Sequence, residues 1–197
     1  MYPDDIDPES GCRLPLPRRE KLNAEAQAVY DRLADPAGGT LRGLRGPGGI
    51  QLHKPGAVAP FAAAQQLFAL PGWVERPRAR AGDPRDRTRA GQPVEWAAHE
   101  DAALREGISK KAIDIIRFRR SLDNLCDIDA IVIQLAREIF GNRIVCQETF
   151  AQALKQFGQR RLVDLVALRG NYAATAALLT AFDMQLDPGQ EPGLPVP

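Results

Sequence analysis

The stretch from residue 128 to 186 constrains the fold more than any other part of the chain. Apolar residues recur there at every third or fourth position, which is the spacing that lines one face of an α-helix. The segment 160–186 is apolar on nearly all sides, a pattern typical of a helix that is buried among other helices. The sequence therefore predicts a central buried helix in which Gly170 and several alanines let neighbouring backbones approach closely.

Turn and capping residues divide the rest of this half into shorter helices. A helix through "VEWAAHEDAALREG" is expected to end at Gly107, and the next is expected to begin at Ser109, a natural N-cap. Gly141-Asn142 and Gly158 are expected to end two further helices. No segment shows a convincing strand pattern. The sequence therefore predicts an all-α fold, a bundle of about six to eight helices.

The first sixty residues hold about half of the 16 prolines and are interrupted by one helix in "RREKLNAEAQAVYDRLAD". The following stretch, "GGTLRGLRGPGGIQLHKPG", could suggest a phosphate cradle, but no strand leads into it and no helix directly follows, so a packed surface loop is favoured. A short helix is expected in "PFAAAQQLFAL". These patterns predict an N-terminal arm over 1–60, a helical domain over 61–186 and an extended tail over 187–197.

The composition is that of a globular protein with one domain or two small ones, at 197 residues, 44% hydrophobic and 26% charged. A net charge of +1 gives no reason to expect nucleic acid. No uninterrupted apolar run reaches the roughly 18 residues of a membrane span, and the acidic N-terminus is no secretory signal, so a cytoplasmic location is expected. The three cysteines are far apart and predict neither disulfides nor a zinc site.

Glu95 and His99 form the pair of residues with the clearest chemical potential. Four positions apart on a helix, they share one face, and a carboxylate there can raise the pKa of an imidazole and fix its tautomer for proton transfer. The alternative is a first-turn acid and a surface histidine, since such pairs are common. His53, the only other histidine, falls in the Gly/Pro-rich loop, where exposure to solvent is the simpler interpretation.

Three segments, 13–56, 95–109 and 148–183, resemble the carboxymuconolactone decarboxylase-like family, which includes the alkylhydroperoxidase D-like proteins. The E-W-x-x-H sequence of Glu95 to His99 and the long helix with "VDLVALRGNYAATAALLTAF" occur together in the family's order. The resemblance implies an all-helical bundle of the alkylhydroperoxidase D-like type, preceded here by a Pro/Gly-rich region. It also implies trimers or hexamers, with an active site between helices and often between subunits.

The resemblance also implies a chemistry. Peroxidase members use a C-x-x-C-x-x-x-H motif, but its cysteine positions correspond here to Gln92 and Glu95, so thiol chemistry has no nucleophile at this motif. The decarboxylase members lose CO₂ from a small lactone acid without metal or cofactor. Carried over, His99 is the general acid/base and Glu95 its partner. Trp96, beside this pair, is an implied substrate-binding residue. Weaker candidates to bind a carboxylate of the substrate are His53, Arg45, Arg42 and Arg13.

Residues 76–91 depart from the family pattern. The family has a buried R-E-x-A-I-L-x-x-A-R helix there, and its glutamate falls at Arg80 of this chain. "ARAGDPRDRT", residues 79–88, can be encoded so that reading one base later gives Arg-Glu-Leu-Ala-Ile-Leu-Val-Thr-Ala. A compensated frameshift in the gene or its sequencing is therefore our hypothesis, and an ordinary basic surface loop is the alternative. We expect residues 76–91 to form an irregular, poorly packed segment. Arg80 favours the second functional hypothesis, a non-catalytic helical oligomer.

Overall fold

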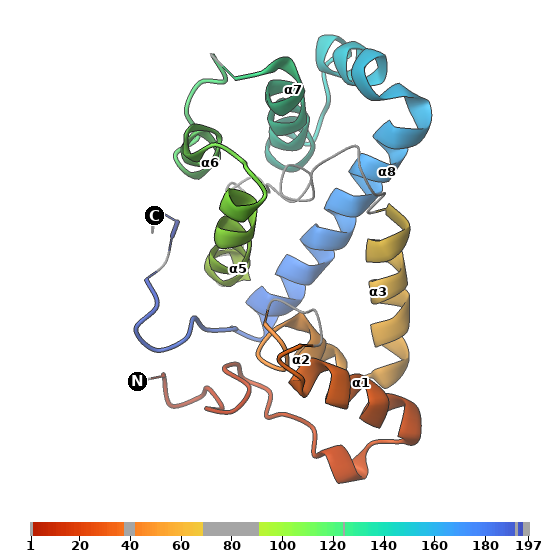
Figure 1. Cartoon of the computed structure of the whole chain (residues 1–197), viewed down its shortest axis with the longest axis vertical. Coiled ribbons are helices and arrows are strands. Elements are labelled where there is room, and N and C mark those ends of the chain that lie inside the picture. The colour runs from red at the N-terminus through yellow and green to blue at the C-terminus, as the bar shows by residue number, and fades with distance from the viewer. Residues whose placement is uncertain (1, 38–41, 69–90, 124, 192, 195–197) are drawn as a thin grey trace. The chain divides into compact units, whose positions relative to one another are not determined.

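The computed structural model describes residues 2–37, 42–68, 91–123, 125–191 and 193–194. Within these ranges it contains seven α-helices and no strand, so the predicted all-α class is confirmed for the described part of the chain (Figure 1). The finer assignment to an alkylhydroperoxidase D-like bundle remains a proposal. The predicted irregular segment 76–91 lies, except for Gly91, outside the described residues.

The chain divides into two compact units, which are described separately. The first unit comprises Met1–Ala64, Thr88–Ala98 and Ala174–Gly193, and the second comprises Gln65–Arg87, His99–Ala173 and Leu194–Pro197. Three of the described helices contribute residues to both units: α3 (Pro55–Phe68), α5 (Gly91–Arg105) and α8 (Gln147–Ala181). The arm over 1–60, the helical domain over 61–186 and the tail over 187–197 stay a prediction.

The N-terminal part of the first unit contains the short 3₁₀ turn η1 (Arg19–Lys21) and helix α1 (Ala24–Ala34). The side chain of Asn23 accepts a hydrogen bond from the amide of Ala26 and caps α1. The helix ends before Asp35-Pro36, as the sequence predicts. Helix α3 (Pro55–Phe68) begins earlier than expected, with Pro60 inside it.

The prediction of a helix-free loop is wrong at 47–51, where α2 (Pro47–Gln51) forms. Pro47 stands in the first turn, where its fixed φ suits a helix and its missing N–H costs nothing. A Cβ on Gly49 would lie 2.0 Å from the carbonyl oxygen of Leu44, so this glycine serves a close backbone approach. The core of the first unit is a cluster of Cys12, Ile50, Val94, Leu179 and Met184.

The second unit contains α6 (Lys110–Arg117), α7 (Asp127–Ala136) and most of α8. Ser109 caps α6 by accepting a hydrogen bond from the amide of Ala112, and Gly107 precedes it with a φ of 85°. Gly158, with a φ of 72°, interrupts α8 where the sequence predicts a helix end. All three predictions are confirmed. The core holds seven buried residues: Val132, Leu135, Ala153, Phe157, Leu162, Leu165 and Leu168.

The helix expected to stop at Gly141-Asn142 ends at Asn142, but its last turn is wider than an α-helical turn. The π-turn η2 (Arg137–Asn142) continues α7 through both residues, and Arg143 then adopts a left-handed φ of 59°. Such wide turns insert an extra residue into the helical ladder and change which side chains face inward. Here the turn carries the buried carboxylate of Glu138, which is only 4% exposed.

The expectation that 160–186 forms a buried central helix holds for only one face of α8. Val163 is 65% exposed and Val166 is 40% exposed, whereas Leu165 is buried. An 18-residue window of α8 reaches a mean hydropathy of 1.2 and is 33% buried. By length and composition α8 therefore meets the minimum for a membrane span, a test that core helices of soluble proteins also pass.

Candidate functional site

Helix α5 carries both members of the predicted catalytic pair. Val94, which is 1% exposed, belongs to the core of the first unit and anchors the helix one residue before Glu95. Glu95 and His99 are one turn apart on the formed helix and both are half-buried. Every residue from 93 to 100 is buried or half-buried, so no side of this part of α5 is fully exposed to water.

The imidazole of His99 contacts one aromatic ring from α8. The ring centroids of His99 and Tyr172 lie 5.6 Å apart at an interplanar angle of 82°, an edge-on arrangement. Such a contact favours one orientation of the imidazole because the positive edge of one ring meets the negative face of the other. Both residues belong to the second unit. The sequence analysis missed Tyr172, since nothing in its apolar surroundings indicates which helix it meets.

This arrangement suits proton transfer more than nucleophilic attack. Half-buried imidazole and carboxylate groups can exchange protons with a ligand while being shielded from part of the bulk solvent. Trp96, also half-buried, is the next residue along α5 after Glu95. No cysteine occupies this helix, and the three thiols of the chain stand at positions 12, 126 and 146. The predicted roles of Glu95, Trp96 and His99 remain predictions.

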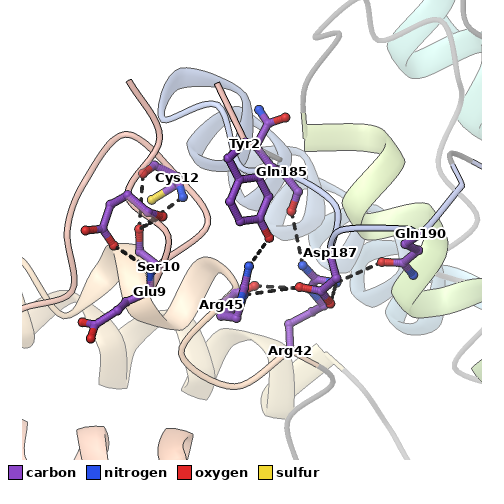
Figure 2. A network of polar contacts seen from close by, with 10 residues as sticks. Tyr2, Glu9, Ser10, Cys12, Arg42, Arg45, Gln185, Asp187 and Gln190 are labelled. Atoms are coloured by element: carbon purple, nitrogen blue, oxygen red, sulfur yellow. Dashed lines mark hydrogen bonds and ion pairs between the residues drawn. The ribbon is translucent and has the colours of Figure 1, made fainter. Parts of the chain in front are cut away.

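The arginines predicted as carboxylate ligands are engaged with the chain itself. Arg42 Nη1 lies 3.1 Å from Asp187 Oδ2, and Arg45 Nε lies 3.3 Å from Asp187 Oδ1. Figure 2 shows both arginines facing this carboxylate. Arg13 pairs with Asp5 and Asp183 in the same unit. These contacts give each arginine a structural function in the folded chain, and a role in substrate binding stays a prediction.

His53 is exposed, and its Nε2 lies 3.0 Å from the carbonyl oxygen of Pro15. His53, Arg42 and Arg45 belong to the first unit, whereas His99 belongs to the second. The structure therefore brings Arg42 and Arg45 together around Asp187, and it brings His99 together with Tyr172. A single site that gathers all the predicted residues remains an expectation from the resemblance.

A buried carboxylate that the sequence analysis missed lies in the second unit. Glu138 accepts hydrogen bonds from Gln134 Nε2 at 2.7 Å, Thr149 Oγ1 at 2.7 Å and the amide of Cys146 at 2.8 Å. Burial alone would raise the pKa of Glu138, but these hydrogen bonds outweigh it and the pKa is lowered. Gln134 and Glu138 are four positions apart, so helical spacing could have predicted their contact. The contacts of Glu138 with Cys146 and Thr149 depend on the π-turn, which the sequence does not indicate.

The cluster of Glu138, Gln134, Cys146 and Thr149 is better explained as a structural connection between two helices than as a reactive site. The carboxylate ties the π-turn to the first residues of α8, where unpaired backbone N–H groups need acceptors. Cys146 Sγ lies 3.5 Å from Glu138 Oε1 and 3.2 Å from Thr149 Oγ1.

In the described part of the chain, no group of three or more His, Cys, Asp or Glu residues is arranged to hold a metal ion. Comparison with known proteins adds no assignment. No family model, no curated protein and no solved structure matches this chain.

Proposed function

We propose that the chain is a carboxymuconolactone decarboxylase-like protein that performs cofactor-free decarboxylation, or related proton transfer, on a small lactone or cyclic carboxylic acid. The observation that carries this proposal is the position of Glu95 and His99, one turn apart on α5 and both half-buried. The resemblance of the E-W-x-x-H sequence supplies the reaction class.

The proposed decarboxylation requires only an acid and a base that are held in position. When the bond to the carboxylate carbon breaks, CO₂ leaves and its electron pair stays on the ring carbon. A protonated His99 would deliver a proton to that carbon, and Glu95 would help to restore the imidazolium. Tyr172 supports this role because its edge-on contact limits how the imidazole of His99 can rotate.

The proposed assembly is a trimer or hexamer, as the resemblance implies, and the proposed location is the cytoplasm. The second candidate is a non-catalytic helical oligomer of the same fold. Arg80 favours it, because a cation stands where the family has a glutamate of the proton relay. A peroxidase is disfavoured because Gln92 and Glu95 occupy the positions of the two cysteines.

The two candidates are separated by measuring CO₂ release from a panel of five- and six-membered lactone acids by the purified chain. The proposal expects turnover of at least one lactone acid without added metal, and the same turnover in the presence of a chelator. A chain that forms a defined oligomer by light scattering but turns over none of the panel is the non-catalytic candidate.

A further inference from the structure

The C-terminal segment of the first unit brings a carboxylate to two guanidinium groups that come from far away in the sequence. Asp187 Oδ2 lies 3.1 Å from Arg42 Nη1, and Asp187 Oδ1 lies 3.3 Å from Arg45 Nε (Figure 2). One negative charge therefore faces two positive ones. Arginine pairs in this geometry are typical of sites that bind carboxylate or phosphate oxygens.

The position of Asp187 is set by backbone contacts on both sides. The amide of Gln185 donates to the carbonyl oxygen of Gly11 at 2.8 Å, and the amide of Gln190 donates to the carbonyl oxygen of Asp187 at 2.9 Å. Pro188 and Gly189, with a φ of 87° at Gly189, have the residue types of a type II turn. A tight turn, not the expected extended tail, therefore occupies 187–190.

The arginines are held in place independently of Asp187. Arg42 donates from Nε to the carbonyl oxygen of Arg45 at 3.2 Å and from Nη2 to that of Gln185 at 3.3 Å. Arg45 donates from Nη2 to the hydroxyl of Tyr2, whose ring centroid lies 5.6 Å from the guanidinium carbon. A group of cations that keeps its geometry without its counter-ion is preorganised for another anion.

Exposure places the carboxylate on the solvent side of this arrangement. The side chain of Asp187 is 49% exposed, whereas that of Arg42 is 12% exposed and that of Arg45 is 34% exposed. An anion from solvent can therefore reach both arginines by taking the place of the Asp187 carboxylate. A doubly charged anion would balance both guanidinium groups, which Asp187 does not.

We infer that Arg42, Arg45 and Tyr2 form a binding site for a small dianion of the phosphate or dicarboxylate class, and that Asp187 occupies this site from within the chain. Binding of the dianion displaces the Asp187 carboxylate and loosens the turn 187–190. The Tyr2 hydroxyl, which accepts from Arg45, keeps its own proton to donate to the bound anion. The site does not depend on the proposed decarboxylation, since its binding is measured without turnover.

Calorimetric titration of the full chain with inorganic phosphate tests the site. Asp187→Asn removes the internal competitor and is expected to bind phosphate roughly tenfold more tightly than the parent. Asp183→Asn is the matched control, because Asp183 lies in the same segment but pairs with Arg13. In the Asp187→Asn background, Arg45→Gln is expected to abolish the gain. Equal phosphate affinity in the parent and in both single variants overturns the proposal.

Two further experiments complete the test: a comparison of anions and a measurement of amide exchange. Malonate is expected to bind as phosphate does and acetate more weakly; acetate binding as tight as phosphate overturns the dianion assignment. If Asp187→Asn fails to fold, amide exchange of the parent replaces it. Phosphate is expected to speed exchange of the Gln190 amide severalfold over sodium chloride of equal ionic strength, and unchanged exchange overturns the proposal.

Discussion

The imidazole of His99 meets the ring of Tyr172 edge-on, with the two ring centroids 5.6 Å apart. We predict that Tyr172→Phe keeps this contact and changes the free energy of unfolding by less than about 1 kcal/mol, whereas Tyr172→Ala lowers it by roughly 2–4 kcal/mol. Urea unfolding measures both values. Equal losses in the two variants would show that the ring contact contributes nothing of its own.

The buried carboxylate of Glu138 gives the chain a pH-dependent stability. Because the pKa of Glu138 is lowered in the folded state, its ionised form stabilises the fold above the pKa of this side chain in the unfolded chain, which is about 4.5. This contribution is lost as the pH falls through the lower, folded pKa. We predict that Glu138→Gln is less stable than the parent at pH 7 in urea melts, and that the difference shrinks as the pH falls through the lowered pKa of Glu138. A constant gap between them at every pH would contradict the assignment.

Two glycines of α8 are predicted to respond oppositely to alanine. Gly158 has a φ of 72°, so Gly158→Ala is expected to destabilise by about 1–2 kcal/mol through left-handed strain. Gly170 stands within α8 and a Cβ there would meet nothing within 4 Å, so Gly170→Ala is expected to stabilise by up to about 1 kcal/mol. Thermal unfolding of the pair provides the check, and a loss in both variants would show that Gly170 is needed for packing.

The frameshift hypothesis for residues 79–88 predicts a gain from a designed replacement. Substituting Arg-Glu-Leu-Ala-Ile-Leu-Val-Thr-Ala for residues 79–87 restores apolar side chains, each worth about 1.5–3 kcal/mol when buried. We expect a rise of several kcal/mol in the free energy of unfolding.

A scrambled peptide of the same composition, which lacks the helical spacing, is the matched control for this replacement. An equal rise in the free energy of unfolding of the control would show that the helical spacing of the apolar residues does not cause the gain. Codons in the underlying DNA that cannot produce the shifted peptide would refute the frameshift directly.

Local signals predicted several of the helix boundaries correctly. Ser109 caps α6, and Gly107 and Gly158 interrupt the helical chain where the sequence indicates, because capping and positive φ depend on a few neighbouring residues. The π-turn was missed because the position of Gly141-Asn142 depends on the contacts of Glu138 with residues further along. The helical segment still ends at Asn142, so the wider turn changes the form of the helix end and not its position.

Contacts between distant residues account for the rest of what the sequence did not reveal. Arg42 and Asp187 are 145 positions apart, and no spacing rule connects them. The same holds for His99 and Tyr172, whose contact depends on how two helices pack. The pair of Glu95 and His99, by contrast, follows from helical spacing alone, which is why it could be proposed from the sequence.

Turnover by two histidine variants tests the central claim most directly. On any lactone acid that the parent decarboxylates, His99→Gln is predicted to lower the rate by about 10²- to 10⁴-fold, because it removes the proton donor. His53→Gln, which changes the other histidine, is the matched control and is expected to retain more of the activity. A His99→Gln variant that releases CO₂ as fast as the parent would contradict the account.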